Sequence, residues 1–268
     1  MVYINALRSA AVLLPVLCHA VSARPFSAEG IEELQRPFFG TTPESNDPQN
    51  DLSLHQQSTP TKVKITAGVM SRCPDAHYCE LTLDRILDRV NSKVNLHLTY
   101  IGQPNSTASW GANCKHGDAE CAGNVHQLCV ADALRPSRAG RDFDLSPSQA
   151  QLKWFDIVAC MNYGKARIGD ESLIKECLNT VKGGPTWDGP DGISECVNGK
   201  RGRKLLLDSI AETKKLDIVN SCTILIEGGT QCVRDDNVWK RCTIPGGHDV
   251  GDFVAEIENQ YARLNESK

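Results

Sequence analysis

The chain has 268 residues, of which 40% are hydrophobic and 23% are charged. This is the composition of an ordinary globular protein with enough apolar residues for one core. The net charge of −4 at pH 7 gives no broad basic surface, which argues against nucleic acid as a partner, and the basic run 200–204 is interpreted as the solvated start of a helix.

The N-terminus has the three-part order of a secretory signal peptide. Arg8 precedes an apolar run over residues 10–18, and small residues follow at 20–23, so residues 1–23 are predicted to be cleaved. This run is too short to cross a bilayer and no later segment is longer, so no membrane association is expected. The predicted destination is the extracellular space or a lysosome or vacuole.

Removal of the signal leaves eleven of the twelve cysteines, because Cys18 is lost with it. An oxidising compartment pairs most of these, and an odd number leaves at least one thiol free. Asn105 and Asn265 begin N-glycosylation sequons that fit the same route.

Residues 24–61 are rich in Pro, Ser, Gln and Asn, with few clustered aliphatic side chains. Such a segment cannot bury enough apolar surface to offset its ordering entropy. We therefore predict a disordered leader or pro-segment over 24–61 and one folded domain over 62–268.

The folded region opens with a predicted strand, helix and strand. Residues 63–70 alternate apolar and polar before becoming continuously apolar, which indicates a half-buried to buried strand. Residues 74–90 carry apolar side chains at helical spacing, and residues 94–101 indicate the next strand. These elements together predict a βαβ unit.

Cys73 immediately precedes the predicted helix. The helix macrodipole stabilises a thiolate there, which makes Cys73 a candidate nucleophile, although Asp75 in the first turn opposes the same charge. Cys79 is six residues on, roughly 9 Å along the axis and about 240° around a regular helix. Disulfides need Cα atoms within roughly 7 Å, so Cys73 and Cys79 are not expected to bond to each other unless that turn is irregular.

The middle of the chain is predicted to be cysteine-rich and helical. Residues 103–147 contain few long apolar runs and three cysteines, which indicates an insertion stapled by disulfides. Apolar spacing predicts helices around 154–161, 173–178 and 205–215. No pairing can be deduced for Cys160, Cys177 and Cys196 from the sequence.

The end of the chain is predicted to contain a strand over 222–226, a hairpin and a helix over 253–264. Cys232 and Cys242 flank the hairpin turn and are interpreted as a cross-strand disulfide. The chain has no P-loop, dinucleotide turn or Gly-x-Ser-x-Gly elbow, so nucleotide-dependent and serine-hydrolase activities have no support.

The most specific signal is the segment Cys-Lys-His-Gly-Asp-Ala-Glu-Cys-Ala-Gly-Asn-Val-His-Gln-Leu-Cys at 114–129. Its order and spacing match C-[QK]-H-G-x-x-E-C-x-x-N-x-x-x-x-C, the signature of the gamma-interferon-inducible lysosomal thiol reductase (GILT) family. The chain therefore resembles that family. The matching residues are Cys114, His116, Gly117, Glu120, Cys121, Asn124 and Cys129.

This resemblance implies a thioredoxin-like α/β fold with a cysteine-rich, disulfide-stapled, largely helical insertion. It also implies two catalytic cysteines three residues apart, but Ala76 stands where the second is expected. The family's cis-proline is also missing, and Ser221-Cys222 occupies its place. These departures are associated with a divergent, fungal-type branch of the family.

By the same resemblance, Cys222 is predicted to approach Cys73. Cys222 then either resolves the mixed disulfide formed at Cys73 or locks Cys73 in a structural disulfide. Cys79 is the second candidate for the resolving thiol.

Histidines beside the cysteines leave further alternatives. His116 is expected to anchor the insertion by hydrogen bonding, with a role as a base as the alternative. His77 is expected to be exposed on its helix, or else to tune Cys73. Zinc binding by these histidines and cysteines is the alternative to disulfides, which are favoured in a secreted chain; its ligands would be Cys114, Cys121, Cys129, His116 and His126.

The sequence therefore predicts a monomeric thiol:disulfide oxidoreductase of the secretory route that reduces protein disulfides through Cys73. No metal or organic cofactor is expected. The alternative is a non-catalytic, disulfide-stabilised secreted protein that keeps the same scaffold.

Overall fold

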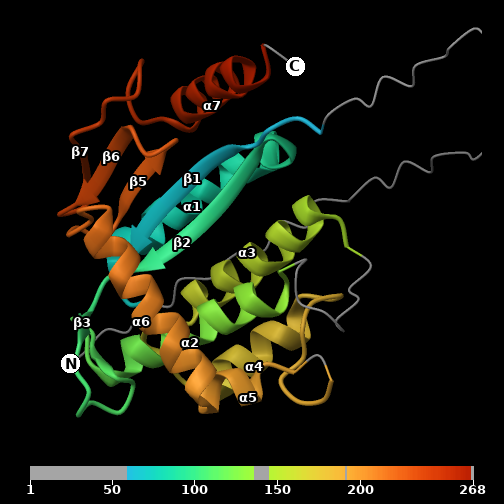
Figure 1. Cartoon of the computed structure of the whole chain (residues 1–268), viewed down its shortest axis with the longest axis vertical. Coiled ribbons are helices and arrows are strands. Elements are labelled where there is room, and N and C mark those ends of the chain that lie inside the picture. The colour runs from blue at the N-terminus through green and yellow to red at the C-terminus, as the bar shows by residue number, and fades with distance from the viewer. Residues whose placement is uncertain (1–58, 136–144, 191, 267–268) are drawn as a thin grey trace, which may run out of the picture. The chain divides into compact units, whose positions relative to one another are not determined.

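The computed structural model describes residues 59–135, 145–190 and 192–266. The predicted signal peptide and all but the last three residues of the predicted leader lie outside these ranges. Within them, a five-stranded sheet has the order β2-β1-β5-β6-β7 (Figure 1). Its strands are β1 (Val63–Val69), β2 (Val94–Tyr100), β5 (Thr223–Ile226), β6 (Thr230–Asp235) and β7 (Val238–Lys240).

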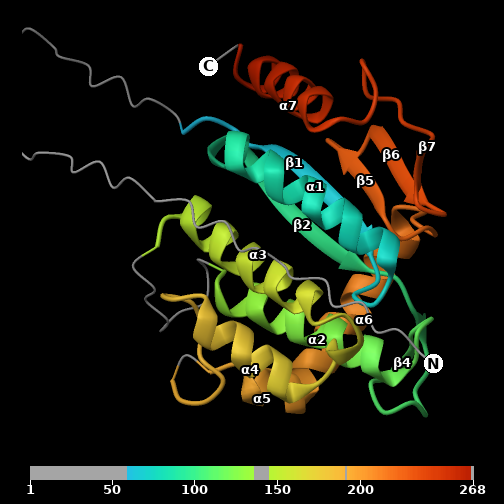
Figure 2. The same cartoon turned by 180° about the vertical axis from the view of Figure 1, so that it is seen from behind.

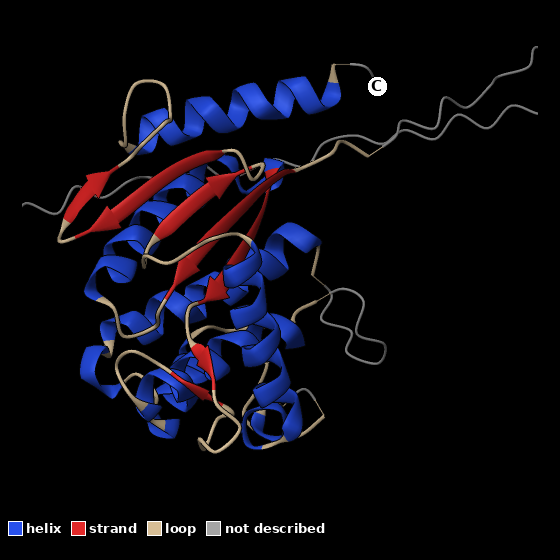
Figure 3. Ribbon diagram, turned by 60° about the vertical axis from the view of Figure 1, so that its left-hand side comes forward, coloured by secondary structure: helices blue, strands red, loops and turns tan. Residues whose placement is uncertain are grey.

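Helices cover the sheet and form a separate helical region beside it (Figures 1 and 2). Helix α1 packs with α7, and α6 packs on β2. In Figure 3 the last helix, α7, runs above the sheet and most of the other helices lie below it. The helices are α1 (Pro74–Val90), α2 (Asp118–Ala133), α3 (Pro147–Tyr163), α4 (Glu171–Thr180), α5 (Ser194–Asn198), α6 (Lys200–Lys215) and α7 (Val250–Asn265), with 3₁₀ turns η1 (Asn91–Lys93) and η2 (Lys165–Arg167).

The strand directions confirm the predicted thioredoxin-like fold. Strand β1 pairs in parallel with β2 through the crossover helix α1, and β5 and β6 follow as antiparallel neighbours. The helices α2 to α6 lie between β2 and β5 in the sequence, so the scaffold is interrupted by a largely helical insertion. A small antiparallel pair, β3 (Gln103–Pro104) with β4 (Ala112–Asn113), was not predicted from the sequence.

The hydrophobic pattern explains why α1 forms where it does. Pro74 occupies the first turn, where its missing N–H costs no hydrogen bond. Leu83, Ile86 and Val90 are buried against the sheet. Leu81, which belongs to the same apolar pattern, lies instead at the surface with 36% exposure.

Disulfides hold the helical region together, as the fold prediction required. Cys129 on α2 is bonded to Cys196 on α5, and Cys160 on α3 is bonded to Cys177 on α4. Each bond joins two helices that are separate in the sequence. Cys232 of β6 is bonded to Cys242, just beyond β7.

The basic run 200–204 does begin a helix, but it is not simply solvated. The guanidinium of Arg201 donates two hydrogen bonds of 2.6 Å to the carboxylate of Asp132 on α2. The Asp132 side chain is only 5% exposed, so this pair fixes α6 against α2. Within the described residues no helix is long and apolar enough to span a bilayer.

Candidate thiol site

Cys73 lies in the loop between β1 and α1, at the N-terminus of the helix. It is the N-cap residue of α1, with an extended backbone conformation. Its N–H donates to the carbonyl of Met70, and its own carbonyl accepts from the N–H of His77. Among the cysteines in the described residues, Cys73 alone is outside a disulfide, and its side chain is half-buried. The site therefore presents a free thiol at the positive end of a helix.

Ser221 connects this loop to the start of β5. Its hydroxyl accepts a 2.9 Å hydrogen bond from the N–H of Met70, and its carbonyl lies 3.6 Å from the Sγ atom of Cys73. The peptide bond between Ser221 and Cys222 is cis. These contacts bring two loops that are nearly 150 residues apart in the sequence to the same thiol.

Cys222 is bonded to Cys79, with a Cα–Cα distance of 6.2 Å. The expectation that Cys222 might lock Cys73 in a structural disulfide was therefore wrong. Cys79 lies on the buried face of α1, and Cys222, just before β5, is buried as well. Helix α1 contacts β6, the strand that pairs with β5. This packing brings the two sulfurs together, whereas Cys73 stays at the end of the helix. Ser221 connects the disulfide to the free thiol. Its carbonyl lies beside Cys73, and the next residue in the chain is Cys222.

The signature segment supports the Cys73 loop directly. The side-chain oxygen of Asn124 accepts a 3.0 Å hydrogen bond from the N–H of Ser71, and the Ser71 hydroxyl donates to the carbonyl of Glu120. A side chain at Gly123 would lie 2.7 Å from the Ser71 hydroxyl, so this contact requires glycine. The N-terminal half of α2 thus holds the residue that lies two positions before Cys73.

The same segment is fixed internally by a disulfide and an ion pair. Cys114 is bonded to Cys121. The backbone N–H and the Nδ1 atom of His116 both contact the buried carboxylate of Glu120. Gly117, the N-cap of α2, has a φ of 79°, a conformation that favours glycine. His116 anchors the start of α2, and the contacts give it no link to Cys73.

Asp75 opposes the Cys73 thiolate less than the sequence suggests. Its carboxylate accepts a 2.9 Å hydrogen bond from the N–H of Asn237 and lies 3.6 Å from the Nε atom of Arg234. Both side chains of this ion pair are largely buried, at 14% and 12% exposure. The positive charge of Arg234 therefore offsets the negative charge that Asp75 places near the helix terminus.

Cys73 opens into a groove of about 570 Å³ between α1 and the end of α3. His77 lines this groove, and its ring meets that of Tyr163 edge to face at 6.5 Å. Burial, and then the charge of Lys165, lower the pKa of His77. The prediction of a simply exposed His77 was wrong, because Tyr163 covers part of the ring.

Glu80 is a buried acid that the sequence interpretation missed. It follows Cys79 on α1 and is only 2% exposed. One carboxylate oxygen accepts a 2.5 Å hydrogen bond from Asn162, and the other has no hydrogen-bond partner among the described residues. Burial raises the pKa of Glu80 to about 7. Its spacing from Ala76, Leu83 and Leu87, all on the buried face, was the available signal.

Zinc binding, the alternative to disulfides, would need thiolate ligands from the cysteines of the signature segment. Cys114, Cys121 and Cys129 are all in disulfides, so none offers a thiolate. The described residues contain no cluster of three or more potential metal ligands. His126 is buried beside Trp187, and burial lowers its pKa to about 4.

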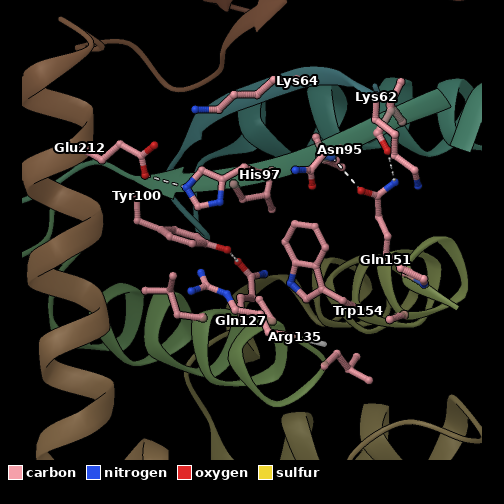
Figure 4. Close-up of a pocket in the computed structure, with 18 residues that line it drawn as sticks. Lys62, Lys64, Asn95, His97, Tyr100, Gln127, Arg135, Gln151, Trp154 and Glu212 are labelled. Carbon is pink, nitrogen blue, oxygen red and sulfur yellow. Dashed lines mark hydrogen bonds and ion pairs between the residues drawn. The ribbon is translucent and has the colours of Figure 1, made fainter. Parts of the chain in front are cut away.

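A larger cavity, of about 860 Å³, lies between β2 and the helices α2, α3 and α6 (Figure 4). Several of its polar side chains bond to each other or to the backbone, whereas Gln127 Nε2 and Trp154 Nε1 have no partner among the described residues. Tyr100 donates to Gln127, His97 contacts Glu212, and Gln151 accepts from the N–H of Leu96. No cysteine lines it. Despite its greater size, this cavity offers no thiol chemistry, so the groove at Cys73 is the candidate site.

The predicted glycosylation sites differ in their surroundings. The amide nitrogen of Asn105 donates to the side-chain oxygen of Asn113. The amide nitrogen of Asn265 donates to the carbonyls of Thr61 and Tyr261. A glycan replaces one N–H of the amide, so at Asn265 it would replace an N–H that one of these bonds uses, whereas at Asn105 the second N–H has no hydrogen-bond partner among the described residues. Glycosylation at both sites remains a prediction.

Comparison with known proteins finds a similarity to one family. The family model described as gamma interferon inducible lysosomal thiol reductase (GILT) matches residues 64–181. A gamma-interferon-inducible lysosomal thiol reductase from Carassius auratus is 27% identical over 103 residues. Residues 64–181 are therefore similar to the GILT family. The matched region contains Cys73, Cys79 and the signature segment but ends before Cys222. The alignment covers 38% of this chain and 32% of the relative, so it spans about a third of the relative's length.

Solved structures with a similar arrangement include thiol-disulfide proteins of low identity to this chain. The oxidoreductase DsbA from Xylella fastidiosa has 15% identity and a TM-score of 0.43, covering 76% of this chain and 87% of that one. The thiol-disulfide exchange protein alpha-DsbA2 from Wolbachia pipientis has 11% identity and a TM-score of 0.46, covering 75% and 82%. These scores are low, and the fold assignment rests on the strand order described above.

Proposed function

We propose that this protein is a thiol:disulfide oxidoreductase that reduces protein disulfides in the secretory route, with Cys73 as its nucleophile. The observation that carries the proposal is the free, half-buried thiol of Cys73 at the start of α1, beside the Cys79–Cys222 disulfide. A helix N-terminus favours the thiolate, which is the reactive form. The similarity of residues 64–181 to the GILT family supports the same activity.

The first step is attack by the Cys73 thiolate on one sulfur of a substrate disulfide. A mixed disulfide forms between Cys73 and that sulfur, and the other substrate sulfur leaves as a thiolate, which takes a proton from water. When Cys79 and Cys222 are reduced, the Cys222 thiolate attacks Cys73 and releases the second substrate thiol. The Cys79 thiolate then attacks Cys222 and frees Cys73.

This sequence transfers two electrons from the Cys79/Cys222 dithiol to the substrate. Its end state has Cys73 free and Cys79 bonded to Cys222, which is the state of the described cysteines. A low-molecular-weight thiol reduces Cys79–Cys222 for the next turnover. The second pair of thiols thus replaces the cysteine that is missing at Ala76.

The five disulfides among the described residues suit an oxidising compartment. The name of the Carassius auratus relative places that protein in the lysosome. We extend the secretory route, ending in a lysosome, a vacuole or the extracellular space, to this chain.

The test measures how fast a small thiol reduces a disulfide-bonded protein at acidic and neutral pH, with and without this protein added. We expect Cys73→Ser to lose all acceleration and Cys79→Ser/Cys222→Ser to lose most of it. Cys160→Ser/Cys177→Ser is the matched control, since it removes a disulfide remote from Cys73. Equal rates for wild type and Cys73→Ser would instead establish a non-catalytic scaffold.

A further inference from the structure

The groove at Cys73 has walls made of exposed aromatic and aliphatic side chains. Tyr163, at the end of α3, is 75% exposed, whereas Tyr78 and Leu81, on α1, are 55% and 36% exposed. All three line the groove together with Cys73. Large apolar side chains gathered on one exposed surface typically mark a place where another molecule binds.

Apart from the thiol and the tyrosines, the titratable side chains that line this groove are basic ones. Arg72, His77 and Lys165 line it, and no acidic residue does so among the described residues. Arg72 is held in place by a 2.9 Å hydrogen bond from its guanidinium to the carbonyl of Ala166. Asp75, the acid nearest in sequence, bonds to Asn237 and Arg234 instead. The groove therefore presents basic groups around an apolar surface.

We infer that the groove selects protein disulfides in which the attacked cysteine is flanked by one large apolar and one acidic residue. This rests on the proposed function and specifies its substrates. The apolar neighbour would pack between Tyr163 and the α1 pair Tyr78 and Leu81. The acidic neighbour would face Lys165 and Arg72. In the reaction, Cys73 bonds to the flanked sulfur, and the other sulfur leaves as a thiolate.

Short peptides with a central cysteine joined to thionitrobenzoate provide the test, because attack at the peptide sulfur releases a coloured thiolate. Four peptides with Leu-Cys-Glu, Ser-Cys-Glu, Leu-Cys-Lys and Ser-Cys-Lys cores separate the two preferences. In single-turnover reactions with the full chain, we expect leucine to raise the second-order rate constant about tenfold over serine. Glutamate should raise it about fivefold over lysine.

Substitutions in the groove should move each preference separately. Lys165→Glu should abolish or reverse the preference for glutamate while the preference for leucine stays. Tyr163→Ser should reduce the preference for leucine while the charge preference stays. Lys182→Glu, at an exposed lysine that does not line the groove, is the matched charge control and should change neither.

The outcomes distinguish the two levels of the proposal. If no peptide reacts faster with wild type than with Cys73→Ser, the proposed function fails. If all four peptides react at one rate, or if Lys165→Glu keeps the preference for glutamate, Cys73 remains reactive and the inferred selectivity is overturned.

Discussion

Two cysteine clusters of this protein each begin just before a helix and continue into it, and they end in opposite states. The cluster at α1 leaves Cys73 free and half-buried, because its neighbour Cys79 bonds to Cys222 from a distant loop. In the cluster at α2, Cys114 bonds to Cys121 within the same segment, and Cys129 bonds to Cys196. Proximity to a helix start therefore does not make a cysteine reactive. The availability of a bonding partner decides which thiol remains for chemistry.

The two clusters are also coupled, because the second supports the first. Asn124 and Glu120 on α2 hold Ser71, which lies two residues before Cys73. We interpret the signature segment as the structural support of the reactive loop, with the redox chemistry placed elsewhere.

The largest expected effect separates the clusters by activity. Cys73→Ser should reduce disulfide exchange to the rate without protein, because no other described cysteine offers a free thiol. Cys114→Ser/Cys121→Ser should retain exchange once folded. Steady-state rates normalised to the folded fraction measure this. Activity that survives in Cys73→Ser and disappears in the double variant would assign the chemistry to the α2 cluster.

The second prediction separates the clusters by stability. Cys79 and Cys222 are 143 residues apart in the sequence, whereas Cys114 and Cys121 are 7 apart. The first disulfide therefore closes a much longer loop. Loop-closure entropy predicts losses of about 5 and about 2 kcal/mol for the respective double serine variants. Denaturant unfolding under non-reducing conditions gives both free energies. The opposite ranking would contradict the entropic explanation.

The third prediction contrasts two buried titratable groups, one near each cluster. The pKa of Glu80 is raised from 4.5 to about 7, so its protonated form favours folding and stability is lost as pH rises between these values. The pKa of His126 is lowered from 6.5 to about 4, so stability is lost as pH falls between these values. The two contributions oppose each other across the same acidic range.

Glu80→Gln should therefore gain stability relative to wild type as pH rises from 4 to 8, on the order of 3 kcal/mol. His126→Gln should gain relative stability as pH falls over the same range. Thermal unfolding curves at several pH values measure both slopes. If the stability difference from wild type changed with pH in the same direction for both variants, at least one of the two groups would not titrate with its shifted pKa.

The smallest predicted effect tests the contact between the clusters. Asn124→Ala leaves the buried N–H of Ser71 without its acceptor, which should cost about 2 kcal/mol. The rate at which Cys73 reacts with an alkylating reagent should change as well, because its loop is released. Asn113→Ala, at an exposed asparagine of β4, is the control. An unchanged alkylation rate in folded Asn124→Ala would remove the supporting role.

The local elements could be predicted because their signals are short-range. The start of α1 at Pro74 and the apolar spacing of Leu83, Ile86 and Val90 reproduce the helix observed. The strand at 94–101 ends one residue earlier, at Tyr100. The seven-position signature predicted the similarity to the GILT family. His77 was misplaced because its surroundings depend on Tyr163 and Lys165, which lie outside its helix.

By itself, the sequence determined the first βαβ unit and a cysteine at a helix start, since periodicity and local spacing encode both. The thioredoxin-like scaffold and its helical insertion followed from the resemblance that the signature segment carries. Only the tertiary structure decided that Cys222 bonds to Cys79, that Cys73 stays free, and that Glu80 lies inside the protein. These outcomes depend on how α1 packs against the sheet. A disulfide forms between sulfurs that packing brings together, and their distance along the chain does not predict it.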